Sequence, residues 1–127
     1  MTETDNLLKM LDKLHQMTDH LNLLLEQIEV DLNACTLGVT ACVPIPELGT
    51  DKHLGYGKHD GKWGLLYISG DSRVSWANTS REFRVNATHH LPDLVCRLRD
   101  ELESQTAKVK EATASVQDFL RTLEAAP

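Results

Sequence analysis

Apolar residues recur at heptad spacing at both ends of this chain, and this pattern constrains the fold more than any other feature. Over residues 7–35 the apolar positions follow each other in alternating steps of four and three. A second apolar row, Met10, Met17 and Leu24, lies one residue before the seam. The stripe is wider than a two-stranded coiled coil requires, so it favours a bundle of three or four helices.

The C-terminal part repeats this spacing over residues 95–123, and Pro92 suits the first turn of such a helix. We therefore predict helices over residues 5–35 and 92–124, each on the order of 45 Å long. Their matched lengths and the compact segment between them suggest an antiparallel pair, with Leu7 near Leu123 and Thr18 near Ala112. Since two helices cannot cover so wide a stripe, we predict self-association, most simply as a dimer. The predicted interface residues are Leu7, Leu11, Leu14, Leu21, Leu25, Ile28, Leu32, Val109, Val116 and Phe119.

The segment between the helices, residues 36–78, reads as a small β-sheet. Asp60-Gly61 is a strong two-residue hairpin signal, and Gly70-Asp71 offers a second turn. Pairing outward from these turns gives a three-stranded antiparallel meander. One of its faces collects bulky residues and should pack on the helices. The bulky residues are Leu54, Tyr56, Trp63, Leu65, Tyr67, Val74 and Trp76.

The opposite face of this meander collects glycines. A glycine in a strand costs roughly 0.5–1 kcal/mol relative to alanine, so close approach to the bare backbone is the expected compensation. A partner or ligand could make that approach, and a sharp twist or bulge is the alternative explanation. The candidate partner-binding residues are Gly55, Gly57, Gly64, Asp60 and Arg73.

The segments flanking the meander are less regular. Residues 39–43 could add a short strand at a sheet edge, because the prolines that follow them suit an edge. Residues 80–90 fit either a strand or a short helix; a helix from about Ser80, kinked near Pro92, is favoured. The overall prediction is a single α+β domain over residues 1–127.

Composition narrows the function classes. The chain has 127 residues and a formal net charge of -6, with 7 Asp/Glu and 2 Lys/Arg in residues 1–35. It shows no basic stripe of the kind that binds a phosphate backbone, so nucleic acid is not an expected partner. Residues 1–10 lack the pattern of a secretory signal, and no apolar run approaches a membrane span. The odd number of cysteines, 3, without a C-x-x-C motif favours the cytoplasm.

The sequence contains candidate residues for three chemical sites, and it favours none of them. A metal site would draw on residues around the β segment, but none shows the usual zinc-ligand spacing. Its candidate ligands are His53, His59, His89, His90, Cys42, Cys96 and Asp60. Cys96 with His90 is a weak candidate nucleophile pair. Stacking aromatics beside basic residues could bind single-stranded nucleic acid. That candidate set is Lys58, Lys62, Arg73, Arg81, Arg84, Trp63, Tyr67 and Trp76.

The order of helix, β insert and helix resembles that of prefoldin subunits, whose paired helices project from an assembled β platform. The resemblance is one of shape and implies no site residues. We expect a non-enzymatic module, without a cofactor or metal, that associates with itself and with another protein. Two alternatives stay open: a small acidic inhibitor of a nucleic-acid-binding protein, and a sensor that binds a metal or small ligand through the histidines of the β segment.

Overall fold

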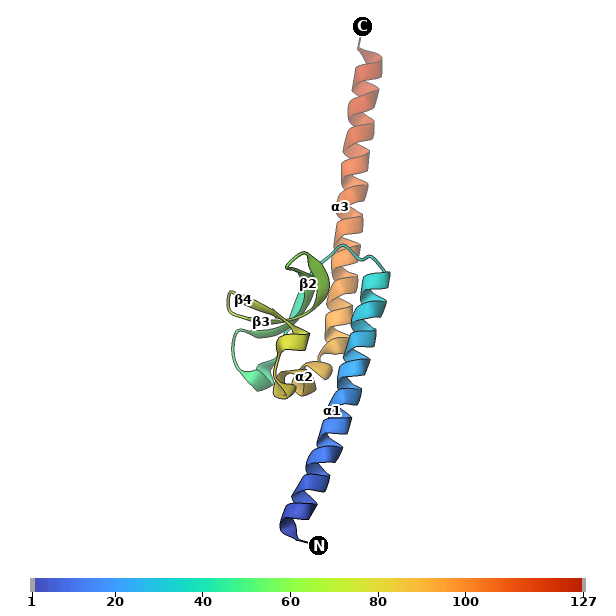
Figure 1. Ribbon diagram of the computed structural model, residues 1–127. Helices are drawn as coiled ribbons and strands as arrows, with labels where there is room; N and C mark the ends of the chain where they lie inside the picture. Colours follow the sequence, from blue (N-terminus) through green and yellow to red (C-terminus); the bar gives the residue numbers. More distant parts are fainter. Residues whose placement is uncertain (1, 127) are drawn as a thin grey trace.

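The computed structural model describes residues 2–126 and confirms the α+β class (Figure 1). Along the chain, a long helix α1 (Glu3–Ala34) comes first and a long helix α3 (Leu91–Ala125) comes last. Between them lie a β-sheet and a short helix α2 (Arg81–Thr88). Two single turns of 3₁₀ helix, η1 (Pro46–Leu48) and η2 (Trp76–Asn78), link strands and helices. Residues 80–90, which the sequence left open between strand and helix, contain α2.

The sheet has four antiparallel strands in the order in which they occur in the chain. They are β1 (Ala41–Pro44), β2 (Lys52–His59), β3 (Lys62–Ser69) and β4 (Ser72–Ser75). The three-stranded prediction was therefore one strand short, and the missing strand is the edge candidate at residues 39–43. The hairpin prediction was right, because Asp60 and Gly61 adopt φ of 50° and 79° and pair Tyr56 with Leu65 across the turn.

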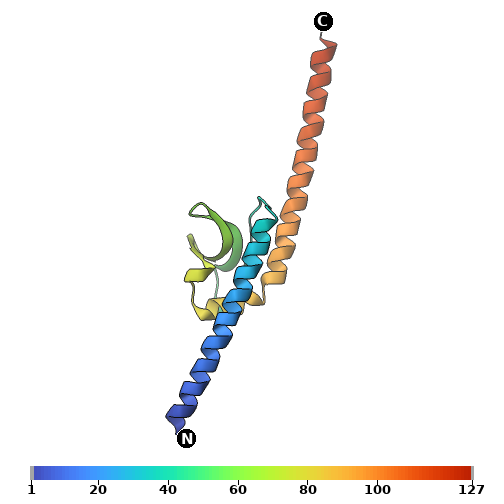
Figure 2. The same ribbon diagram turned by 45° about the vertical axis from the view of Figure 1, so that its right-hand side comes forward.

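The antiparallel arrangement of the two long helices was wrong. Figures 1 and 2 show α1 and α3 running in the same direction, offset along their length, with the chain termini at opposite ends of the molecule. Two contacts agree with this direction. Arg84 belongs to α2, the short helix that leads into the start of α3, and its Nη1 donates to Asn22 Oδ1 of α1 at 2.6 Å. The segment that follows α1, residues 37–40, lines a groove with residues 101–109 of α3.

The helix ends also differ slightly from the prediction. Helix α1 begins two residues early, because Thr2 and Asp5 form a reciprocal capping box at its N-terminus. Ser80 caps α2 by accepting a hydrogen bond from the Phe83 amide. A break at residues 89–90 separates α2 from α3, so the predicted kink is a change of helix.

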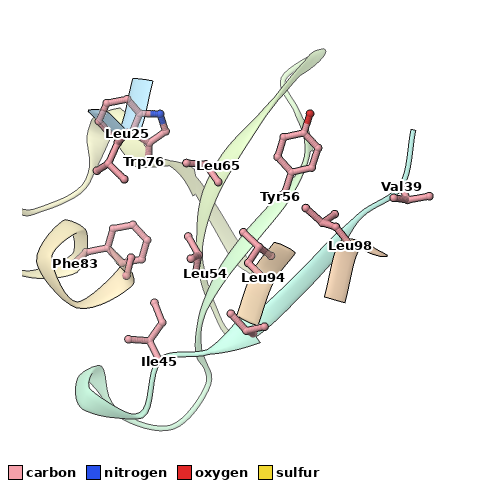
Figure 3. Close-up of a cluster of buried hydrophobic side chains, with 12 residues drawn as sticks. Leu25, Val39, Ile45, Leu54, Tyr56, Leu65, Trp76, Phe83, Leu94 and Leu98 are labelled. Carbon is pink, nitrogen blue, oxygen red and sulfur yellow. The ribbon is translucent and has the colours of Figure 1, made fainter. Parts of the chain in front are cut away.

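The core forms where the bulky face of the sheet meets the three helices (Figure 3). Leu54, Tyr56 and Leu65 of the sheet are buried against Leu94 and Leu98 of α3. Phe83 and Ala87 of α2, Leu25 of α1, and Trp76 of η2 complete this cluster. The bulky face packs on the helices as the alternation in the sequence predicts.

Each long helix contributes only part of its length to this core. We call residues 3–20 of α1 the N-arm and residues 103–125 of α3 the C-arm. Each arm has about 20 residues and is roughly 30 Å long. We call the rest of the described chain, residues 21–102, the body. The arms leave the body in opposite directions (Figure 1). This geometry differs from helices that project together from a platform, so the resemblance in shape to prefoldin subunits does not hold.

Candidate functional site

The most distinctive surface of the described chain is the pair of apolar stripes on the two arms. The side chains of these stripes are between 41% and 68% exposed, although they are large and apolar. On the N-arm they are Leu7, Leu8, Met10, Leu11, Leu14 and Met17. On the C-arm they are Val109, Val116, Phe119, Leu120 and Leu123. Contiguous exposed apolar patches are a feature of interaction sites.

The structure divides the predicted interface residues into two groups. Six of them lie exposed on the arms: Leu7, Leu11, Leu14, Val109, Val116 and Phe119. Four lie on the part of α1 that packs against the body: Leu21, Leu25, Ile28 and Leu32. In this second group Leu25 is only 4% exposed, and the other three pack against the same core. The predicted interface is therefore kept only for the six residues on the arms, because the other four are used in the packing of the body.

The glycine-rich face of the sheet is covered in part by side chains of this same chain. A Cβ added at Gly55 would lie 2.7 Å from Ile68 Cδ1, and one added at Gly57 would lie 3.2 Å from Thr40 Cγ2. Arg73, on β4, is exposed on the border of this region. Close approach to the bare backbone therefore occurs here within the chain.

Gly64 has a different role, because it makes room for a side chain of α1. The pairing of β3 with β4 covers Leu66–Ser69, so the first half of β3, residues 62–65, has an open edge. Glu29 Oε2 accepts a hydrogen bond from the Leu65 amide at 2.8 Å. Asn33 Nδ2 donates to the Trp63 carbonyl at 3.1 Å. Two side chains of α1 thus replace the strand that is missing at this edge.

A cavity of about 830 Å³ opens beside this edge. Its walls include Glu29 and Asn33 of α1, Tyr56 and Trp63 of the sheet, and the hairpin turn at Asp60. The Tyr56 and Trp63 rings stack with their centroids 5.8 Å apart. Two of the candidate partner-binding residues, Asp60 and Gly64, line this cavity, whereas Gly57 and Arg73 line another hollow on the sheet.

The Tyr56 hydroxyl links the sheet to α1 by donating to Asn33 Oδ1 at 2.6 Å. In Figure 3 the hydroxyl points away from the apolar cluster that holds the ring. Burial raises the pKa of Tyr56 above its ordinary value of 10.0, and the nearby Glu29 carboxylate raises it further. The neutral phenol is therefore the form that the folded state favours.

Replacing Tyr56 by phenylalanine should lower the free energy of unfolding by about 1 kcal/mol at neutral pH, because the bond to Asn33 is lost. The raised pKa predicts a second effect. The Tyr56 contribution to stability is complete below the ordinary pKa of 10.0 and declines as the pH rises through the folded-state value. Urea unfolding of both proteins across this range should show a steeper alkaline loss in the wild type. Equal slopes would contradict this assignment.

The candidate metal ligands do not come together. Within residues 2–126 no group of three or more His, Cys, Asp or Glu side chains is placed to hold a metal ion. His90 Nε2 instead lies 2.8 Å from Glu47 Oε2, which joins η1 to the start of α3. The pKa of Glu47 lies below its ordinary value because of a hydrogen bond from its own backbone and, next, that of His90. Cys35, Cys42 and Cys96 are unpaired and exposed.

The aromatic residues proposed for base stacking belong to the body. Trp76 is buried, Trp63 stacks on Tyr56, and the Tyr67 ring lies 4.4 Å from the Phe83 ring, measured between centroids. Arg84 is engaged within the chain, since its guanidinium donates to Asn22 and to the Thr79 carbonyl. These side chains therefore do not form an open platform for bases. None of the helices in residues 2–126 combines the length and apolar character that a membrane crossing requires.

Sequence reasoning missed Glu29 and Asn33, and it considered Arg84 only for nucleic-acid binding; all three join the long helix α1 to the rest of the body. Glu29 and Asn33 each follow an apolar seam position by one residue, so they border the buried stripe of α1. That position, together with a glycine inside a strand, was the available signal. Comparisons with protein-family models, curated proteins and solved structures find no match to this chain.

Proposed function

We propose that this protein is a non-enzymatic assembly module, which joins copies of itself through the apolar stripes of its N-arm and C-arm. The observation that supports this function is the exposure of large apolar side chains at heptad spacing on two helical arms. Residues 103–125 are all exposed, and in the N-arm only Thr18 is partly buried.

The need to stabilise the arm helices supports the same proposal. A helical segment that packs on nothing gains no stabilisation from tertiary contacts. Most helical stability in proteins comes from packing of the apolar side. The arms have that apolar side but lack a partner for it within residues 2–126. Association would bury both stripes and stabilise both helices.

The test is to place a charge in each stripe and measure the mass of the particle. In the double variant Leu11→Asp/Val116→Asp, both stripes carry a carboxylate that association would have to bury. We expect the wild type to be larger than one chain by light scattering, and the double variant to have the mass of one chain. Burial of an unpaired carboxylate costs several kcal/mol, so the effect should be complete at micromolar concentration.

The matched control places the same charges on the opposite side of the arms, at Gln16→Asp/Ala114→Asp. These residues lie two positions away from seam residues, which on a helix is about 200° around the axis. The control should keep the mass of the wild type. A wild type that has the mass of a single chain at high concentration would refute the proposed function.

A further inference from the structure

We infer that the arms join unlike ends: the C-arm of one copy packs against the N-arm of a second copy, in parallel, so that copies add head to tail. This inference rests on the proposed function and specifies its geometry. It names the partner surface of each arm, which the exposure of the stripes alone does not do.

The first support is continuity with the packing inside the chain. The seam of the N-arm continues along α1 into Leu21, Leu25 and Ile28, which pack in the body with Leu94 and Leu98 of α3. The seam of α3 likewise continues outward into the C-arm. Each exposed stripe is thus an extension of a stripe that is buried in the body, in a cluster that both long helices share with the sheet. In the body the two helices run parallel (Figure 2).

The second support is the space beside the C-arm. Helix α1 ends at Ala34, whereas α3 continues to Ala125 in the same direction, so the C-arm passes beyond its neighbour (Figure 1). A groove of about 620 Å³ lies at the base of the C-arm, between residues 37–40 and residues 101–109. The N-arm of a second copy, placed in line with α1, would bring its first turns to this groove. The C-arm (residues 103–125) is about five residues longer than the N-arm (residues 3–20), so the N-arm would cover most of the C-arm.

The third support is the size of the side chains along the two seams. The N-arm seam begins with large residues and ends with a smaller one: Leu7, Leu11, Leu14 and Thr18. The C-arm seam begins with the polar Gln105, continues with small residues and ends with large ones: Val109, Ala112, Val116, Phe119 and Leu123. Beyond Gln105, parallel packing sets large against small, which fills space evenly.

Other pairings fit these seams less well. In an antiparallel pair, Leu7 would face Leu123 and Thr18 would face Ala112, so large meets large at one end and small meets small at the other. A pair of C-arms would set Ala112 against its own copy and leave space beside it. Because a head-to-tail contact joins two different surfaces, it does not close on itself unless the copies curve into a ring.

The test uses the two single variants, Leu11→Asp and Val116→Asp, alone and mixed. We expect each variant alone to have the mass of one chain, because every contact requires an intact arm of each kind. A mixture in equal amounts should double the mass, since the intact C-arm of the first variant meets the intact N-arm of the second. The wild type should exceed two copies and grow with concentration. Circular dichroism checks that each variant keeps a folded body.

The outcomes separate this inference from the proposed function. If a single variant still forms dimers alone, like arms pair with each other and the inference is wrong. If the mixture keeps the mass of one chain while the wild type associates, the unlike-arm contact is also wrong. A wild type that stops at two copies refutes open parallel addition. A wild type with the mass of one chain refutes the proposed function itself.

Discussion

Replacing Leu94 by alanine should lower the free energy of unfolding by about 3 kcal/mol, within the range that buried leucines show. Leu94 has 0% exposure and lies among Ile45, Leu54 and Phe83, where elements from both ends of the chain meet (Figure 3). The truncation removes apolar contacts and leaves a cavity, because the surrounding strands and helices can collapse only in part. Urea unfolding at a fixed protein concentration measures the loss.

Leu123→Ala is the matched control for this experiment, because it makes the same truncation on the same helix. Leu123 is 55% exposed near the end of the C-arm. Both truncations are compared in the Leu11→Asp/Val116→Asp background, where the stripes are not paired, and there Leu123→Ala should change the unfolding of the body by less than about 0.5 kcal/mol. The two variants together test whether the body is the stable unit. Similar losses for both would show that the C-arm unfolds together with the body, contrary to this assignment.

The strands were predictable because the pattern that defines them is local. Alternation of bulky and small residues fixes which side of the sheet is buried, and the Asp60-Gly61 turn fixes the register of β2 against β3. Beyond the second turn the predicted register was right, with Tyr67 opposite Val74, but the expected last pair, Leu65 with Trp76, does not form. The ladder ends at Leu66 and Ser75, because the chain turns into η2 at Trp76 to bury its ring.

The direction of the helix pair could not be predicted in the same way. A heptad pattern reads the same in both directions, so it shows that a helix needs a partner without showing how the partner runs. The direction here follows from α2, which returns the chain to the middle of α1 and is fixed there by the Arg84–Asn22 bond. A single long-range hydrogen bond of this kind leaves no periodic signal in the sequence.

The sequence predicted the apolar stripes of the long helices, but it did not show which parts of these helices project from the body. The seam of α1 has the same composition where it packs on the body, at Leu25, and where it is exposed, at Leu11. The positions of the sheet and of α3 along α1 decide which part is covered. The polar contacts at the open edge of β3 were less predictable still, since they depend on where β4 ends.

The edge of β3 offers a sharp test, because Gly64 and Glu29 occupy the same space. A Cβ at position 64 would lie 2.5 Å from Glu29 Oε2 and 3.0 Å from its Cδ. Gly64→Ala should therefore displace the carboxylate and leave the Leu65 amide without its partner in a buried position. Loss of such a partner costs about 1–2 kcal/mol. Glu29→Ala removes the same bond and should cost a similar amount.

The effect of Gly64→Ala should reverse its sign once Glu29 has been removed. In the Glu29→Ala background the added methyl meets no carboxylate, and alanine in a strand is more favourable than glycine by roughly 0.5–1 kcal/mol. The two substitutions should therefore be coupled by about 2 kcal/mol in urea unfolding of the four proteins of the cycle. Glu26→Ala, an exposed change on the same helix, is the control background, in which Gly64→Ala should stay destabilising. Additive effects of Gly64→Ala and Glu29→Ala would mean that Glu29 does not hold this edge of the sheet in solution.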